Sequence, residues 1–250
     1  MDGFLNVNKP LGITSFDVIR TLNRIQPGVK MGHLGTLDPM ATGVLPIALG
    51  KATRLIEYID NRIKVYAARM VLGGISDTQD ATGNITWLDS DPAEPEQIIQ
   101  TAKSFIGVIQ QIPPMYSAVH YQGQRLYQLA RKGITVEVNP RQVEIYSLDI
   151  TDISSNESGL IQVSFKVKCS EGTYIRTLCH DMGQKLATGA YMDKLIRVCS
   201  GVFRIEESYT PETIMTIGLK SCLKPLDYPI NKFPAMQLSE ENYNRVCNGN

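Results

Sequence analysis

The sequence lacks several features that mark common classes of protein. No apolar run comes near the roughly 20 residues that a membrane-spanning helix needs. The first ten residues have no charged segment followed by an apolar one, so they do not resemble a secretion signal. There is no internal repeat and no low-complexity segment. We therefore expect a globular, cytoplasmic protein with no membrane partner.

Paired metal-binding cysteines are also lacking. The five cysteines are widely spaced and form no C-x-x-C pair, which disfavours a zinc site and favours reduced thiols buried as small apolar side chains. They are Cys169, Cys179, Cys199, Cys222 and Cys247. No metal and no other cofactor is expected.

The sequence also has no excess of charge of either sign. Lys and Arg number 25 and Asp and Glu number 25, so the formal net charge is zero. Proteins that bind nucleic acid are often basic overall. An RNA partner would therefore require local clustering of positive charge.

What is present is enough apolar sequence for a core, at 43 % of 250 residues. Periodicity predicts strands interspersed with short helices and no regular βαβ rhythm, which favours an α+β fold with a mixed, mainly antiparallel central sheet flanked by helices and loops. The predicted strands are residues 3–7, 44–49, 64–72, 143–150, 160–169 and 202–205. The predicted helices are residues 15–25, 53–59, 96–106, 126–132, 173–186 and 211–217.

The densest chemical signal lies in residues 32–43, Gly-His-Leu-Gly-Thr-Leu-Asp-Pro-Met-Ala-Thr-Gly. A glycine-rich loop can approach a ligand closely, and Pro39 biases Asp38 toward an extended backbone. A carboxylate on such a loop suits a nucleophile or a base. The alternative on spacing alone is an aspartate that only stabilises a turn.

This segment resembles the signature loop of the TruB family of tRNA pseudouridine synthases, G-H-x-G-x-L-D-P-x-A-T-G, and matches it at every fixed position. The resemblance implies that Asp38 is the catalytic aspartate. It also implies that His33 lies near a flipped nucleotide.

Further segments match the same family in the same order, over residues 3–205. They are Asn8-Lys9-Pro10-x-Gly12-x-Thr14-Ser15, Lys64-Val65-Tyr66, Pro113-Pro114-Met115-Tyr116-Ser117-Ala118, Gly123-x-x-Leu126-Tyr127-x-x-Ala130-Arg131, Ser170-Glu171-Gly172-Thr173-Tyr174-Ile175-Arg176-Thr177-Leu178, and Gly189-Ala190 with Leu195, Arg197 and Gly201-x-Phe203. By resemblance, Lys9 supports the active-site loop, Tyr66 stacks on the target base and Arg176 pairs with Asp38. Tyr174 and Leu195 are implied to contact the substrate.

The resemblance implies a pseudouridine-synthase fold with an inserted RNA-gripping thumb at about residues 113–141. The implied reaction is isomerisation of uridine to pseudouridine in the T-arm loop of tRNA, at position 55. It breaks and re-forms a base–sugar bond without redox change or metal, by base flipping and a carboxylate acting as nucleophile or base. An arginine that donates two hydrogen bonds to Asp38 would keep it ionised.

The thumb carries a local excess of positive charge, as RNA binding requires. Residues 120–141 contain four basic side chains against Glu137, with Tyr121 and Tyr127 between them. The basic side chains are Arg125, Arg131, Lys132 and Arg141. A solvated helix face is the alternative reading of this charge.

Two features depart from the family pattern. His120 stands where the family usually has a thumb lysine, which would weaken one phosphate contact. Bacterial members usually continue into a small RNA-binding domain called PUA. We expect residues 1–235 to form the catalytic domain, residues 236–250 to form a tail in which PUA is absent or vestigial, and the protein to be a monomer.

Two other functions compete with this one. A tRNA-binding or folding protein on the same scaffold would be expected to have lost Asp38 or Arg176, and both are present. A glycoside or nucleoside hydrolase would need a second carboxylate as its acid. The sequence offers Asp77, Asp80 and Asp181 for that role, and their spacing singles out none of them.

Overall fold

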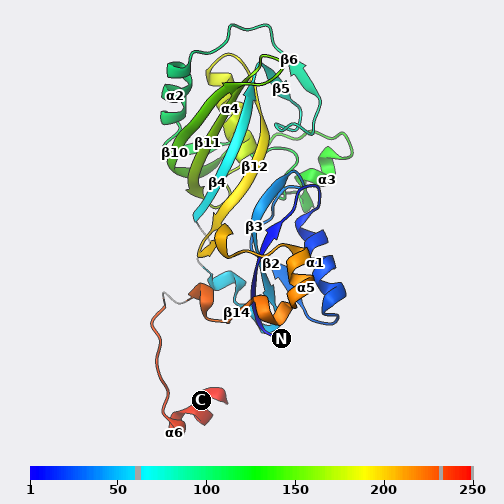
Figure 1. Cartoon of the computed structure of the whole chain (residues 1–250), viewed down its shortest axis with the longest axis vertical. Coiled ribbons are helices and arrows are strands. Elements are labelled where there is room, and N and C mark those ends of the chain that lie inside the picture. Colours follow the sequence, from blue (N-terminus) through cyan, green and yellow to red (C-terminus); the bar gives the residue numbers. More distant parts are fainter. Residues whose placement is uncertain (60–62, 231–232, 249–250) are drawn as a thin grey trace.

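A computed structural model describes residues 1–59, 63–230 and 233–248. One mixed sheet of ten strands runs along the length of the molecule (Figure 1). Its order is β14 (Leu223–Lys224), β1 (Gly3–Lys9), β3 (Ala41–Leu49), β12 (Ala190–Ser200), β4 (Ile63–Leu72), β11 (Ile161–Ser170), β10 (Arg141–Ser155) and β7 (Gly107–Gln111), with β13 (Phe203–Arg204) paired to β12 and β2 (Met31–His33) to β3. Two small sheets add β5 (Gly74–Ser76) with β6 (Ile85–Trp87) and β8 (His120–Tyr121) with β9 (Gln124–Arg125).

The main sheet is antiparallel except where β3 and β12 run parallel. The predicted α+β class with a mixed, mainly antiparallel sheet is therefore confirmed. The parallel pair requires a close approach at Gly43, where an added Cβ would lie 2.3 Å from the carbonyl oxygen of Arg197. Gly43 also has φ +101°, a conformation that glycine adopts readily.

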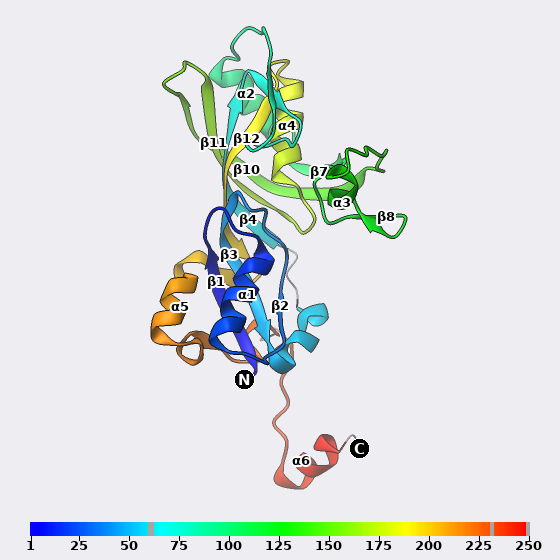
Figure 2. The same cartoon turned by 90° about the vertical axis from the view of Figure 1, so that its right-hand side faces the viewer.

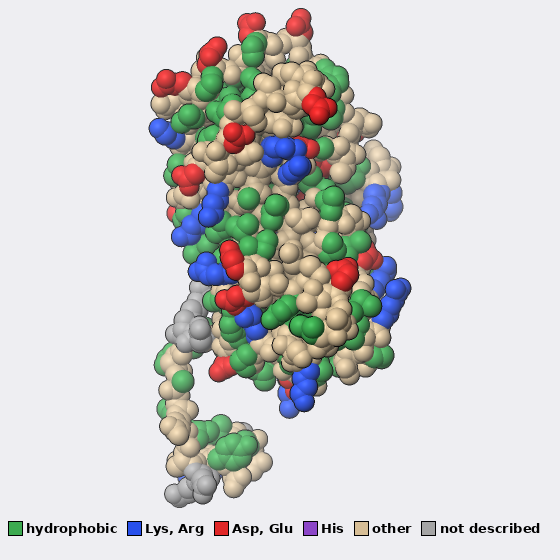
Figure 3. Space-filling model, in the orientation of Figure 1, with side chains coloured by type: hydrophobic (Ala, Val, Ile, Leu, Met, Phe, Trp, Pro, Cys, Tyr) green, Lys and Arg blue, Asp and Glu red, His purple; other side chains and the backbone are tan. Residues whose placement is uncertain are grey.

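Helices cover one face of the sheet and leave much of the other open. The α-helices are α1 (Ser15–Ile25), α2 (Pro95–Lys103), α3 (Leu126–Ala130), α4 (Ile175–Lys185), α5 (Pro211–Ile217) and α6 (Glu240–Cys247). In Figure 1, α4 lies behind strands β4, β11 and β12, and Figure 2 shows α1 and α5 on the lower half of the sheet. On the open face, basic side chains are interspersed with acidic ones (Figure 3).

Helix α1 shows how local sequence sets an element boundary. Thr14 caps its N-terminus by accepting a hydrogen bond from the backbone N of Asp17, and Asp17 in turn accepts one from the backbone N of Thr14. The helix ends at Ile25, before Gln26. The predicted start and end of this helix match the structure.

Several predicted elements need correction. Strand β12 was not predicted, although it lies at the centre of the sheet, and β7 was also missed. The predicted loop 32–43 is shorter, because β2 extends to His33 and β3 begins at Ala41. The predicted helix 53–59 is instead two 3-10 turns, Gly50–Arg54 and Ile56–Tyr58.

The core consists mainly of side chains between the sheet and its helices. Val163, Phe165 and Val167 of β11 all point into it, as their alternation predicts. Four cysteines are buried as expected, whereas Cys247 is exposed on α6. Helix α6 lies apart from the sheet in both ribbon views, and the last two residues of the predicted tail are outside the described part. No helix in the described residues is long and apolar enough to cross a membrane.

Candidate active site

The loop between β2 and β3 carries Asp38, and buried polar groups hold its backbone. Lys9 at the end of β1 is fully buried and donates from Nζ to the carbonyl oxygens of Pro10 (2.9 Å), Ile13 (2.7 Å) and Pro39 (3.3 Å). It thus ties the start of α1 to the residue after Asp38. These are the contacts through which the implied support of the loop by Lys9 would act.

Two further side chains fix the same loop. Ser15 Oγ accepts from the backbone N of Leu37 (2.8 Å) and donates to the carbonyl oxygen of Leu37 (3.1 Å). On the other side, the buried Arg197 of β12 donates to the carbonyl oxygens of Gly35, Thr36 and Val44. Both residues lie in recognised motifs, but neither was predicted as a site residue.

Asp38 and Arg176 are brought together although they are far apart in the sequence. Arg176 Nε lies 3.0 Å from Asp38 Oδ2, and its Nη1 lies 3.5 Å from Asp80 Oδ2. Nη1 and Nη2 also donate to the carbonyl oxygens of Thr78 (3.1 Å) and Tyr116 (2.9 Å). The guanidinium is therefore shared between two carboxylates, instead of gripping Asp38 alone through two bonds.

Asp80 is a further site residue that the sequence did not assign. Its carboxylate is buried and accepts hydrogen bonds from Thr78 Oγ1 (2.8 Å), from the backbone N of Thr82 (3.0 Å) and from the Thr82 hydroxyl. The pattern Thr-x-Asp-x-Thr in a polar turn was the available signal. A buried carboxylate held by three donors is a fixed anchor for Arg176.

The other carboxylates considered for a hydrolase are not placed to serve as its acid. Asp77 is exposed and accepts hydrogen bonds from the backbone and side chain of Asn84. Asp181 lies on α4, where burial raises its pKa to about 6, and it is not among the described residues that line the cleft around Asp38.

The Asp38 side chain is 35 % exposed, whereas Arg176 is 4 % exposed. Burial within the loop raises the pKa of the Asp38 carboxyl, and the Arg176 guanidinium opposes this rise. Burial lowers the pKa of Lys9 to about 8, and the charge on Asp38 opposes that change. Asp38 is thus a half-exposed carboxylate between two cations.

A cleft of about 1210 Å³ opens over Asp38 and is lined by residues from both halves of the molecule. Eight predicted site residues line it, namely Asp38, Arg176, Tyr66, His33, Leu195, Tyr174, Arg125 and Arg131. Lys132 and Arg141 are exposed but, in the described part of the chain, lie outside this lining, and Lys9 lies beneath it. The structure therefore gathers most of the predicted set in one place.

The cleft floor is formed by β4 and β12. Tyr66 is 8 % exposed and Leu195 is 7 % exposed, which leaves an aromatic and an apolar surface beside Asp38. Burial raises the pKa of the Tyr66 hydroxyl, so the phenol stays protonated. His33 has a buried Nδ1 without a hydrogen-bond partner among the described residues, and burial lowers its pKa.

The predicted thumb forms one wall of the cleft. It contains α3 and the short β8–β9 hairpin, and its four predicted basic residues are all exposed. The Arg131 guanidinium lies 5.4 Å from the centre of the Tyr127 ring. Within the described residues, no group of three or more His, Cys, Asp or Glu side chains is arranged to hold a metal ion.

Two family models match the chain. Residues 20–175 match "TruB family pseudouridylate synthase (N terminal domain)". Residues 176–231 match "tRNA pseudouridylate synthase B C-terminal domain". The boundary between them falls in α4, directly before Arg176.

Curated relatives match along the whole chain. A tRNA pseudouridine synthase B from Syntrophomonas wolfei is 49 % identical, covering 100 % of this chain and 84 % of the relative. One from Clostridium kluyveri is 43 % identical with the same coverage. Among solved structures, a Cbf5–Nop10–Gar1 complex contains a similar chain, with a TM-score of 0.76 and 28 % identity over 99 % of this chain and 67 % of that one.

Proposed function

The chain belongs to the TruB family of pseudouridylate synthases, which isomerise uridine in tRNA to pseudouridine, and we propose that its target is the uridine at position 55 in the T-arm loop. The observation that carries the proposal is the pairing of Asp38 with Arg176 at the base of a large cleft. The thumb beside that cleft supports an RNA substrate. We propose that the protein acts as a monomer in the cytoplasm, where its tRNA substrate would be found.

Asp38 is the proposed catalytic residue. The reaction breaks the bond between C1′ of the ribose and N1 of the base, then joins C1′ to C5. C5 loses its proton and N1 gains one, so the atoms balance without a cofactor. Asp38 can attack C1′ as a nucleophile or remove the 2′ proton as a base, and either role requires the ionised carboxylate that Arg176 favours.

The target uridine must leave its stack to reach Asp38, at a cost of roughly a few kcal/mol. We assign the receiving surface to Tyr66 and Leu195, which line the cleft beside Asp38. Stacking of a base on an aromatic ring stabilises the flipped state by about 1–3 kcal/mol. His33 and Tyr174 border the same space and are proposed to contact the flipped nucleotide.

Residues 1–235 would act as the catalytic domain, with the thumb at about residues 113–141 gripping the RNA backbone. Arg125 and Arg131 are the strongest candidates for phosphate contacts, since both line the cleft. Lys132 and Arg141 would contribute from outside the cleft. Lys9 would act by holding the Asp38 loop, since it donates to the carbonyl oxygen of Pro39.

The deciding experiment is tritium release from a tRNA transcript labelled at uridine C5. Wild type should release tritium, and Asp38→Asn should reduce the rate by at least about 10⁴-fold, because the isosteric amide can neither attack nor accept a proton. Asp77→Asn is the matched control, since Asp77 is exposed and should leave the rate unchanged. A transcript with cytidine at position 55 should release nothing from that site.

Two outcomes would overturn the proposal at different levels. If wild type releases no tritium while it still binds the transcript, the catalytic role of this chain is wrong. If it releases tritium equally from the transcript with cytidine at position 55, the enzyme is intact and only the proposed target position is wrong.

A further inference from the structure

Two buried cations lie directly beneath the loop that carries Asp38. Arg197 is 1 % exposed and Lys64 is 4 % exposed. A Cβ added at Gly35 would lie 3.6 Å from Arg197 Nη1 and 3.9 Å from Lys64 Nζ. These are ordinary contact distances, so the loop packs against the ends of both side chains at Gly35.

The hydrogen bonds of the two cations differ. Arg197 donates to three carbonyl oxygens, so its guanidinium is well satisfied. Within the described ranges, Lys64 Nζ makes one hydrogen bond, to Ser200 Oγ at 3.0 Å, although an ammonium has three hydrogens to donate. A buried ammonium with one neutral acceptor is costly unless a further partner reaches it.

No carboxylate in the described part of the chain lies within 4.0 Å of Lys64 Nζ. The charged and titratable groups around it are Arg197, the exposed Glu171 and the thiols of Cys169 and Cys199. Burial raises the pKa of both thiols, that of Cys169 to about 12, so they stay neutral. Two cations thus lie together with little negative charge near them.

Lys64 also lines the cleft and lies two residues before Tyr66 on the same face of β4. Residues at this spacing are about 7 Å apart along a strand. A nucleotide with its base at Tyr66 would therefore place an adjoining phosphate within reach of Lys64. The substrate would supply a close negative charge, which no described carboxylate within 4.0 Å provides.

We propose that Lys64, with Arg197 behind it, forms an anion subsite for a phosphate of the bound RNA, and that Lys64 takes up a proton when the RNA binds. This inference rests on the proposed function of the cleft. It makes Lys64 a binding residue whose charge depends on the substrate.

The electrostatics of the free protein agree with this assignment. Burial lowers the pKa of Lys64 to about 7, and the charge on Arg197 lowers it further. At pH 8 the free side chain is therefore mostly neutral, whereas a phosphate beside it would favour the ammonium form. Below pH 6 Lys64 is already charged in the free protein, so binding should take up no proton there.

Proton uptake can be measured by isothermal titration calorimetry at pH 8 in buffers with different heats of ionisation. The probe is a tRNA transcript already converted to pseudouridine by the enzyme, so that turnover adds no heat. Wild type should take up close to one proton more than Lys64→Arg, because arginine stays charged at this pH. Lys9 and His33 contribute equally to both proteins, so the difference reports Lys64.

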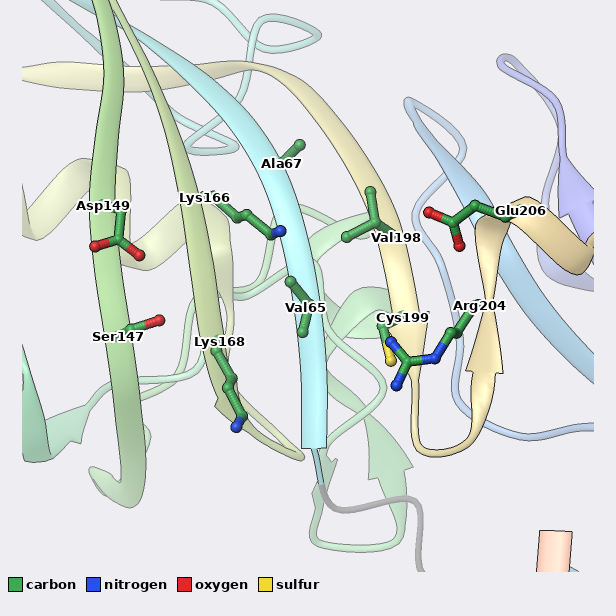
Figure 4. Close-up of a pocket in the computed structure, with 10 residues that line it drawn as sticks. All are labelled: Val65, Ala67, Ser147, Asp149, Lys166, Lys168, Val198, Cys199, Arg204 and Glu206. Carbon is green, nitrogen blue, oxygen red and sulfur yellow. The ribbon is translucent and has the colours of Figure 1, made fainter.

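Affinity and its salt dependence test the contact itself. Lys64→Met should weaken binding about tenfold and lower the slope of log K against log salt concentration by about one. Lys166→Met is the matched control, since Lys166 is exposed on the opposite face of the sheet, in a groove that it shares with Asp149 and Glu206 (Figure 4). It should change neither the slope nor the proton uptake.

The inference is wrong if wild type and Lys64→Arg take up equal numbers of protons at pH 8. It is also wrong if a folded Lys64→Met protein keeps the wild-type salt slope. Tritium release by wild type separates these results from a failure of the proposed function, because release can persist while the subsite is absent. Thermal unfolding of each variant shows whether it is folded. If Lys64→Met does not fold, the comparison of proton uptake between wild type and Lys64→Arg still tests the inference.

Discussion

Arg176 contacts two carboxylates, and this sharing determines how Asp38 is presented. Asp38 is half-exposed and available to a substrate, whereas Asp80 is buried and bound by threonine donors. Asp80 therefore holds the guanidinium in place, and the guanidinium holds Asp38. A displacement of a catalytic group by as little as about 1 Å from its productive position can slow a reaction about 100-fold.

Replacing Asp80 with Asn should consequently slow catalysis more than it weakens binding. The amide keeps the shape but removes the charge that orients Arg176. We expect the single-turnover rate of tritium release to fall about 10- to 100-fold, with tRNA affinity changed less than about threefold. Asp77→Asn, in the same turn but exposed, should affect neither quantity. A rate equal to wild type would show that Asp80 does not position Arg176.

Lys64 makes a second prediction at this scale, for stability. Its pKa is about 7 in the folded protein and 10.5 as the ordinary value, so between these the unfolded chain binds more protons. The free energy of unfolding should then rise with pH from 7 to about 10, by at most about 1.4 kcal/mol per unit from this group. Urea unfolding at pH 7 and pH 9 should show a smaller rise in Lys64→Met. An identical rise would mean that Lys64 is not desolvated on folding.

At the scale of elements, the sequence predicted those with regular periods. Strand β11 alternates strictly and α1 carries a capping box, so both were found close to their true bounds. Strand β12 was missed because its register against β4 shifts twice, between Met192 and Lys194 and between Arg197 and Cys199. Each shift breaks the alternation of period two on which the prediction depends.

In the site, too, features that neighbouring residues determine were predictable, whereas contacts between residues far apart in the sequence were not. Asp38 stands out within its loop, since glycines and Pro39 mark it locally. The pairing with Arg176 came from family resemblance alone, because no spacing rule connects two elements so far apart. Asp80 lies in a turn that looked only polar, and its role depends on which side chain the fold brings to it.

The parallel contact between β3 and β12 predicts that the protein is destabilised when Gly43 gains a side chain. Gly43→Ala would place a Cβ 2.3 Å from the Arg197 carbonyl oxygen, and either strand must move to relieve that overlap. We expect a loss of about 3 kcal/mol or more in the free energy of unfolding, measured with urea. Gly107→Ala is the control, since Gly107 has a similar φ of +106° and no atom within 4 Å of the added Cβ. It should cost only about 1 kcal/mol. Equal losses would show that backbone conformation alone requires Gly43.

For the whole molecule, one continuous sheet explains how the site is assembled. Strands β4 and β12 run between the two halves, so the Asp38 loop from the lower half meets α4 and the thumb from the upper half (Figure 1). The groove on the open face carries both signs of charge in similar numbers. The cleft lining also carries both signs, but its basic residues, which include Arg125, Arg131 and Arg176, outnumber its acidic ones. A chain with no net charge can thus present a local positive surface to RNA.

This arrangement predicts that the position of a positive charge matters more than its number. Replacing Arg125 and Arg131 together with Gln removes two charges from the cleft lining, and replacing Lys132 and Arg141 removes two from outside it. We expect the first pair to lower the salt slope of tRNA binding by about two, and the second pair by less than about one. Both proteins have the same net charge, so each is the control for the other. Equal slopes would mean that the RNA responds to the overall field of the thumb, and that the cleft makes no separate contact with the phosphates.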